Sequence, residues 1–217
     1  MATRTETAEG CDSIQDGASE IRLTPNESMT DEQDGSFERD GYAVARGVFD
    51  RLSLDVYATY ALMLRAGKRF RPGDESGSLD LYGDTLTESM LLRLKPAIEQ
   101  TTGLKLFPTY SYLRIYETGA ALARHTDRHA CEISVSLTIW YDAQEPWPLW
   151  LESHGRPRSV ALRPGDMLVY KGCEVPHWRE SFGGGYWIQA FFHYVDADGP
   201  LASYKFDGRR AIGLPRD

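Results

Sequence analysis

Two histidines and one aspartate are spaced so that they could hold a metal ion. His125 and Asp127 are separated by one residue, and in an extended strand such side chains point to the same face. His177 follows Asp127 by 50 residues (177 − 127), enough for several strands to return to the same place. Two imidazoles and one carboxylate suit non-haem Fe(II) and leave three coordination positions open. We therefore expect His125, Asp127 and His177 to be both the metal ligands and the catalytic centre.

The residues around this triad make the pattern more specific, because His-x-Asp alone is equally compatible with a surface polar pair. Tyr116 to Gly119 forms a Tyr-x-x-Gly strand end before His125. Pro164-Gly165-Asp166 forms a turn before an apolar strand, and the distal histidine comes next. In this order of motifs, residues 37 to 195 resemble the Fe(II)/2-oxoglutarate-dependent oxygenase superfamily.

The resemblance implies a jelly-roll enzyme that uses Fe(II), O2 and 2-oxoglutarate as cosubstrate. Such an enzyme hydroxylates, or otherwise oxidises, an unactivated C–H bond and releases succinate and CO2. The expected substrate is a small molecule such as an amino acid or a natural-product intermediate. Relatives that halogenate lack the carboxylate that Asp127 supplies here, so the resemblance favours hydroxylation or another oxidation, such as desaturation or ring formation.

The far carboxylate of 2-oxoglutarate requires a cation, best an arginine that can donate two hydrogen bonds. Many relatives place Arg or Lys about ten residues after the distal histidine, where this chain has Trp187 and Gln189. Arg179 is our first choice instead, because it lies two residues after His177 and shares its face of a strand. The structural alternative for Arg179 is an ion pair with Asp127 or Glu180.

Other residues are candidates for the cosubstrate site. Arg114 and Arg128 are weaker alternatives to Arg179. Tyr116 resembles the position of a tyrosine that hydrogen-bonds the cosubstrate in some relatives, although it could be a half-buried strand aromatic. Gln189 could point into the barrel as a neutral donor.

The remaining histidines compete with the triad. His129 has the same strand parity as His125 and is the nearest rival, although a pocket role is expected for it. His154 lies in a predicted turn and His193 near the end of the last strand, so both are expected to be structural or surface histidines.

Apolar spacing predicts two helices, at about residues 52–65 and 86–102. The second begins at a capping box, Thr85 to Glu88, and ends at Gly103. Residues 66–84 between the helices are rich in Gly, Pro, Ser and Asp and predict a loop. The stripe expected to pack the first helix on a sheet comprises Leu52, Val56, Tyr57, Tyr60, Met63 and Leu64.

From residue 110 onwards the hydrophobic period changes to two. About eight short strands separated by turn signals indicate a mainly β protein with flanking helices, a double-stranded β-helix of the jelly-roll, cupin-like type. The predicted strands are 110–116, 122–127, 132–141, 147–152, 158–162, 167–171, 175–181 and 186–195.

Composition limits the possible partners. The chain has 217 residues and a net charge of −8, and residues 1–40 hold 3 basic and 11 acidic residues, so the rest is balanced. A balanced body without a basic stripe argues against a nucleic-acid backbone as the partner. Residues 1–35 are expected to be a flexible acidic tail, and residues 36–217 a single jelly-roll domain.

The same sequence gives no sign of a membrane segment or of secretion. No run of about 18 apolar residues exists, and the first residues lack the apolar segment of a signal peptide, so we expect a cytoplasmic protein. Cys11, Cys131 and Cys173 form no spaced pairs, which argues against a disulfide framework or a Cys-rich zinc site.

Three rival functions stay open at this point. One is a cupin-type metal enzyme that does not use 2-oxoglutarate, which the missing arginine near residue 187 keeps possible. Another is a non-catalytic jelly-roll binding protein, because a fold alone does not give function. The third, within the same class, is a hydroxylase of protein side chains. The oligomeric state is not predicted.

Overall fold

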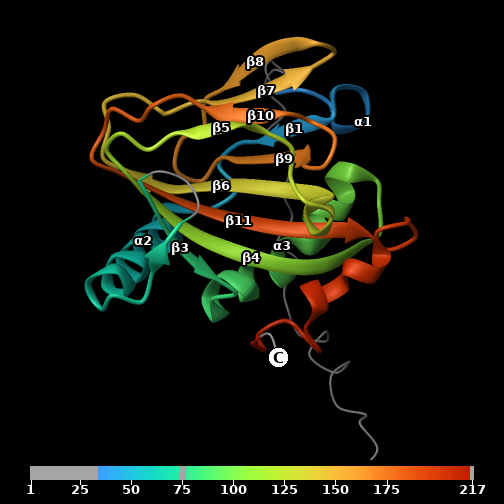
Figure 1. The fold of residues 1–217 in the computed structure, drawn as a ribbon, viewed down its shortest axis with the longest axis horizontal. Helices are drawn as coiled ribbons and strands as arrows, with labels where there is room; N and C mark the ends of the chain where they lie inside the picture. The colour runs from blue at the N-terminus through green and yellow to red at the C-terminus, as the bar shows by residue number, and fades with distance from the viewer. Residues whose placement is uncertain (1–33, 74–76, 216–217) are drawn as a thin grey trace, which may run out of the picture.

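The computed structural model describes residues 34–73 and 77–215, so nearly all of the acidic tail expected over residues 1–35 lies outside the described part. Two antiparallel sheets face each other (Figure 1). The seven-stranded major sheet has the order β1-β9-β6-β11-β4-β3-β2, and the four-stranded minor sheet has the order β5-β10-β7-β8. The strands are β1 Tyr42–Ala45, β2 Arg71–Pro72, β3 Ser78–Tyr82, β4 Leu106–Glu117, β5 Leu122–His125, β6 Ile133–Tyr141, β7 Leu149–Ser153, β8 Arg156–Val160, β9 Met167–Lys171, β10 His177–Arg179 and β11 Tyr186–Asp196.

This architecture confirms the prediction of a mainly β jelly roll with flanking helices. Several neighbouring strands of the major sheet are far apart in sequence: β11 lies between β4 and β6, and β9 lies between β6 and β1. Such crossing connections bring segments from the whole chain to one site between the sheets. Each of the central strands alternates its side chains between the two faces of the sheet.

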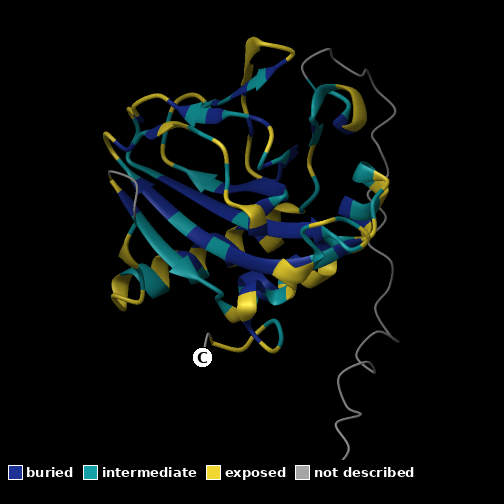
Figure 2. Ribbon diagram, turned by 45° about the vertical axis from the view of Figure 1, so that its right-hand side comes forward, coloured by how far each residue is buried: buried dark blue, intermediate teal, exposed yellow. Residues whose placement is uncertain are grey.

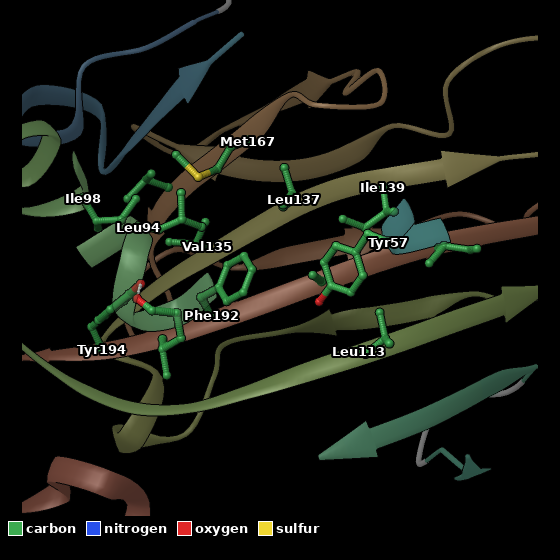
Figure 3. Packing of buried hydrophobic residues seen from close by; sticks show 14 of the residues in the cluster. Tyr57, Leu94, Ile98, Leu113, Val135, Leu137, Ile139, Met167, Phe192 and Tyr194 are labelled. Atoms are coloured by element: carbon green, nitrogen blue, oxygen red, sulfur yellow. Dashed lines mark hydrogen bonds between the residues drawn. The ribbon is translucent and has the colours of Figure 1, made fainter. Parts of the chain in front are cut away.

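The outer face of the major sheet packs against helices. Helix α2 spans Arg51–Ala66 and α3 spans Thr85–Thr102, close to the expected ranges of 52–65 and 86–102. A short helix, α1, covers Phe37–Asp40. Figure 3 shows Tyr57, Leu94 and Ile98 of the helices beside strand residues of β4, β6, β9 and β11 in one apolar cluster. The strand residues labelled there are Leu113, Val135, Leu137, Ile139, Met167, Phe192 and Tyr194.

The predicted buried stripe of α2 is wrong in part. Leu52 is 73% exposed and Met63 is 69% exposed, whereas Leu54, Ala58 and Ala61 are buried with Tyr57. The buried face of α2 contacts β6 and carries the small residues Ala58 and Ala61, which allow close packing.

The start of α3 also differs from the prediction. Its N-cap is Asp84, whose side chain accepts a hydrogen bond from the Thr87 backbone N–H, so Thr85 is the first helical residue and not the cap. Glu88 reaches the side chain of Arg209, 2.6 Å away, with both side chains 1% exposed. Gly103 ends the helix in the left-handed conformation, φ 72°, as predicted.

The predicted loop over residues 66–84 is wrong as well, because it contains β2 and β3. Strand β3 pairs with β4 over five residues, from Ser78 opposite Tyr116 to Tyr82 opposite Tyr112. Pairing with a long central strand satisfies the backbone groups of a short segment that has little strand propensity of its own. The result extends the major sheet beside the pocket described below.

Burial follows this arrangement. The central strands of the major sheet are mostly buried along their length, while the helices expose one face (Figure 2). Within residues 34–73 and 77–215, no helix is both long enough and apolar enough to cross a membrane.

Candidate metal centre and its pocket

His125 and His177 face each other across two strands of the minor sheet. The antiparallel register of β10 and β5 places His177 opposite His125, and their ring centroids are 4.3 Å apart. The predicted strand through Asp127 is wrong, because β5 ends at His125. Asp127 lies in the following loop, where its backbone N–H donates to the Gly172 carbonyl at 2.8 Å. That bond, rather than strand parity, turns the carboxylate toward the two imidazoles.

The three side chains converge on one point. Asp127 Oδ1 lies 3.6 Å from His125 Nε2 and 3.5 Å from His177 Nε2. Each histidine also bonds through Nδ1 to the carbonyl two residues earlier, His125 to Ala123 at 2.8 Å and His177 to Val175 at 3.0 Å. A carbonyl oxygen only accepts, so both rings carry their proton on Nδ1 when neutral.

These hydrogen bonds leave the Nε2 lone pairs of both rings directed at the carboxylate oxygen. Three electron-pair donors that meet with no proton between them fit a cation, and fixing the far ring nitrogen by a backbone carbonyl is the usual arrangement for metal-binding histidines. Two imidazoles and one carboxylate suit Fe(II). The donor set therefore fits the metal that the sequence predicts.

The second oxygen of Asp127 is held from behind. Ser134 Oγ donates to Asp127 Oδ2 at 2.7 Å. Gly172 lies against this pair so closely that a Cβ there would be 2.6 Å from both Asp127 Oδ2 and Ser134 Oγ. Only glycine leaves room for the carboxylate in this orientation. The sequence offered no signal for Ser134 or Gly172, because both contact Asp127 only in the folded structure.

Arg179 lies in the same pocket as a buried cation without an acidic partner. Its side chain is 3% exposed, and Nη1 donates to the Trp147 carbonyl at 2.6 Å. Nη2 is buried without a hydrogen-bond partner, and none of the described carboxylates lies within 4 Å of the guanidinium. Burial lowers the pKa of Arg179 to about 10. The alternative ion pairs with Asp127 or Glu180 are not formed.

The two other candidate arginines are already neutralised. Arg114 makes a two-pronged ion pair with Asp80, both N···O distances being 2.6 Å. Arg128 pairs with Asp207 at 2.7 and 2.9 Å. An anion entering the pocket therefore finds its unpaired positive charge at Arg179.

Tyr116 and Gln189 lie in different surroundings. Tyr116 is fully buried and lines the cavity, and its hydroxyl accepts a 3.3 Å bond from Arg114, which leaves its own hydrogen to donate. Gln189 faces the inside of the barrel but is not among the cavity-lining residues. Its amide donates to Ser136 Oγ at 2.8 Å and accepts from Trp187 and Thr138. The structure brings Tyr116 to the pocket and leaves Gln189 in a satisfied network beside it.

The triad, Arg179 and Tyr116 line one cavity of about 150 Å³. Alternation along β4, read as Tyr110, Tyr112, Arg114 and Tyr116, was the one sequence signal that could have found its aromatic wall. The cavity is lined by Tyr110, Tyr112, Arg114, Tyr116, Leu122, His125, Asp127, Leu149, Tyr170, His177, Arg179, Phe191 and His193.

The remaining histidines divide differently from the prediction. His129 is exposed and lies 3.3 Å from the Tyr204 hydroxyl, so it is not in the pocket. His154 is exposed beside Asp40, at 3.1 Å. His193 is not the surface histidine that the sequence allowed, because it is 5% exposed and lines the cavity. Burial lowers its pKa to about 4.

A second group of possible ligands adjoins the triad. Asp127, Cys131 and His193 have donor atoms within 4.8 Å of one another. Cys131 lies 2.8 Å from the Tyr110 hydroxyl, and burial raises the pKa of its thiol. Only a thiolate binds metal well, so this group is the poorer site, and the triad is the better one.

Sequence comparison finds no protein-family model and no curated protein that matches the chain. Solved structures do match. A Pseudomonas putida prolyl-4-hydroxylase has a TM-score of 0.62 and 18% identity, over 74% of this chain and 95% of that chain. The epimerase SnoN, in complex with Fe3+, alpha ketoglutarate and nogalamycin RO, has a TM-score of 0.65 and 17% identity, over 85% and 93%. HygX from Streptomyces hygroscopicus, with nickel, 2-oxoglutarate and hygromycin B bound, has a TM-score of 0.63 and 13% identity, over 78% and 88%.

At these identities the likeness is one of fold, and it extends over most of each chain. A solved structure from Burkholderia pseudomallei that is described as a 2OG-Fe(II) oxygenase family oxidoreductase matches in the same way, with a TM-score of 0.62 and 15% identity, over 82% of this chain and 95% of that chain. The chain therefore has the jelly-roll fold of the Fe(II)/2-oxoglutarate-dependent oxygenases.

Proposed function

We propose that this protein is an Fe(II)- and 2-oxoglutarate-dependent oxygenase that oxidises an unactivated C–H bond of a small molecule. The observation that carries the proposal is the position of Arg179. A buried guanidinium without a carboxylate partner is unfavourable unless a ligand brings the missing negative charge. It stands two residues after His177 on β10, in the same cavity as the three converging metal donors.

A dicarboxylate with an oxo group beside one carboxylate has the chemistry to satisfy both ends of this cavity. One end would face the donors of His125, Asp127 and His177, which would hold the metal that binds it. The other end meets the Nη2 group of Arg179 and the hydroxyl hydrogen of Tyr116. Charge-assisted bonds of this kind are the strong ones in a buried site. This assigns Arg179 and Tyr116 to the cosubstrate, with Gln189 as a residue that supports the indole of Trp187.

When bound, Fe(II) with 2-oxoglutarate and O2 supplies the oxidising chemistry, and the protein supplies position and a dry cavity. His125 and His177 would hold the metal through Nε2, because their Nδ1 atoms bond to the carbonyls of Ala123 and Val175. Trp147 and Trp187 cover the guanidinium of Arg179, at 4.5 and 5.3 Å, and exclude water from its anion.

A small substrate is favoured by the limited and partly enclosed volume of the cavity. Two of the structurally similar proteins were solved with small molecules, hygromycin B and nogalamycin RO, which supports the same substrate class here.

The proposal is tested by anaerobic titration of the Fe(II)-loaded protein with 2-oxoglutarate, followed by the weak visible charge-transfer band of the chelate. We expect the band to form with the natural chain. In Arg179→Met the 2-oxoglutarate concentration for half-saturation should rise by at least 10-fold, because one charge-assisted bond is worth about 1.5–3 kcal/mol. The control is His154→Ala, which removes an exposed histidine outside the cavity and should titrate like the natural chain.

The second candidate function is the cupin-type enzyme without 2-oxoglutarate, favoured only by the unusual place of the arginine. Iron binding without a charge-transfer band would make it the better assignment. A band that is unchanged in Arg179→Met would contradict the role of Arg179 and leave the cosubstrate to another cation.

A further inference from the structure

Ser134 connects the metal ligand Asp127 to His193. Its hydrogen bonds fix the position of its own hydroxyl hydrogen and of the ring proton of His193. Its hydroxyl oxygen is 2.7 Å from Asp127 Oδ2, 3.1 Å from the Cys131 carbonyl and 3.0 Å from His193 Nδ1. A serine has one hydrogen to give and two lone pairs that accept. A carboxylate and a carbonyl can only accept, so the single hydrogen of Ser134 is directed to them.

The nitrogen of His193 must therefore donate to Ser134. If Nδ1 were an acceptor, one hydroxyl hydrogen would face three acceptors. A neutral imidazole that carries its proton on Nδ1 has an unprotonated Nε2, which is a hydrogen-bond acceptor. Among the residues that the structure describes, none donates to this Nε2, although the side chain is buried and lines the cavity.

The surroundings of this acceptor are aromatic. The ring of Tyr110 lies 4.5 Å from that of His193, and its hydroxyl is occupied by Cys131 Sγ at 2.8 Å. Phe191 and Tyr112 stand opposite each other on β11 and β4 and line the same cavity. The wall around this acceptor is thus aromatic, and the Nε2 atom is open to the cavity. The charged groups that act on His193 are Asp127, Arg128, Asp207 and Arg114. Arg128 is paired with Asp207 and Arg114 with Asp80, while Asp127 faces His125 and His177.

We propose that His193 determines substrate specificity by accepting, at Nε2, a hydrogen bond from an O–H or N–H group of a flat, uncharged substrate that packs on Tyr110, Tyr112 and Phe191. Ser134 places this acceptor beside the metal ligand Asp127, so a substrate bound to it would lie near the metal. This part of the inference rests on the function proposed above. The bond that is oxidised then belongs to a carbon near the hydroxyl or amine group. A site built to receive a hydrogen-bond donor rejects an analogue that lacks it, since the acceptor stays unpaired.

Phenol and toluene are matched probes for this acceptor, because they have the same shape and differ in a hydroxyl against a methyl group. Dissociation constants are measured by ligand-observed NMR on the full chain, both metal-free and loaded with Zn(II) and 2-oxoglutarate. We expect phenol to bind at least 10-fold more tightly than toluene, and this preference to fall below 2-fold in His193→Phe. His129→Phe makes the same change at an exposed histidine outside the cavity and should keep the preference.

A second measurement reads the ring directly. In 15N-histidine-labelled protein, His193 should show a protonated Nδ1 and an unprotonated Nε2, and phenol but not toluene should shift the Nε2 resonance. A protonated Nε2, equal binding of the two probes, undetectable phenol binding, or a preference that persists in His193→Phe would each overturn the inference. If the protein prefers phenol but binds no 2-oxoglutarate, the acceptor role of His193 would be supported and the proposed oxygenase function would be refuted.

Discussion

Arg179 is held by Trp147 from two directions. It donates a 2.6 Å hydrogen bond to the backbone carbonyl of Trp147, and its guanidinium carbon lies 4.5 Å from the centre of that indole ring. These contacts position the cation without neutralising it. They make the pocket ready for an anion before the anion arrives, which reduces the ordering that binding requires.

Removing this charge should stabilise the ligand-free protein. The pKa of Arg179 is lowered by burial to about 10 from 12.5, so the cost of charging the buried group is present at every pH below about 10 and is complete at pH 7. We expect Arg179→Met to raise the free energy of unfolding by about 1–2 kcal/mol, after the lost carbonyl bond and ring contacts are subtracted. Urea unfolding without metal or cosubstrate measures it.

The comparison variant is Arg114→Met, which removes an arginine that is paired. It leaves the mostly buried carboxylate of Asp80 without its partner, so we expect a loss of up to about 3–5 kcal/mol. If both substitutions destabilise the protein equally, Arg179 is not an unpaired charge.

Metal binding should depend on Asp127, the carboxylate that lines the cavity. Asp127→Ala removes the one anionic donor that faces both Nε2 atoms. We expect Mn(II) affinity, measured by the EPR signal of the free ion, to fall by more than the ~10- to 100-fold that loss of a supporting hydrogen-bond partner causes. Asp142→Ala is a suitable control, since Asp142 lies in a turn outside the cavity. Unchanged affinity in Asp127→Ala would exclude the triad.

Gly172 should be irreplaceable although it has no side chain that could bind the metal. In Gly172→Ala the new methyl group would meet Asp127 Oδ2, Ser134 Oγ and the Cys131 carbonyl. We expect a loss of about 1–3 kcal/mol in unfolding free energy and weaker Mn(II) binding, because the carboxylate must shift. The same substitution at Gly183, where nothing lies within 4 Å, should leave both unchanged. Normal metal affinity in Gly172→Ala would show that the loop moves without disturbing Asp127.

His193 should make the metal-free protein less stable in mild acid. Burial lowers its pKa from 6.5 to about 4, so between these values the unfolded chain binds a proton that the folded protein does not. Stability from this group is complete above pH 6.5 and falls as the pH drops toward 4, by about 1.4 kcal/mol per unit. Unfolding curves at pH 7 and pH 5 should therefore differ more for the natural chain than for His193→Phe. Identical pH dependence in the two proteins would show that His193 titrates normally.

Much of the site could be predicted from the sequence because its chemistry is local or periodic. The spacing of His125 and Asp127, the distal His177, and the parity of Arg179 with His177 are properties of short segments. The jelly-roll class followed from the change of hydrophobic period, since alternation along a strand depends only on which face is buried. Asp127 was chosen for a wrong reason, because β5 ends at His125 and a backbone bond to Gly172 orients the carboxylate.

The sequence by itself determined which residues could bind metal and which could form strands. Only the tertiary structure decided which charges are neutralised: Arg114 finds Asp80 and Arg128 finds Asp207, and Arg179 is left unpaired. It also brought His193 beside Asp127 through Ser134, which is 59 residues away from His193 in the sequence. Ion pairing and proton position depend on distances of a few ångströms between strands that meet only after the sheets close, so no pattern along the chain contains them.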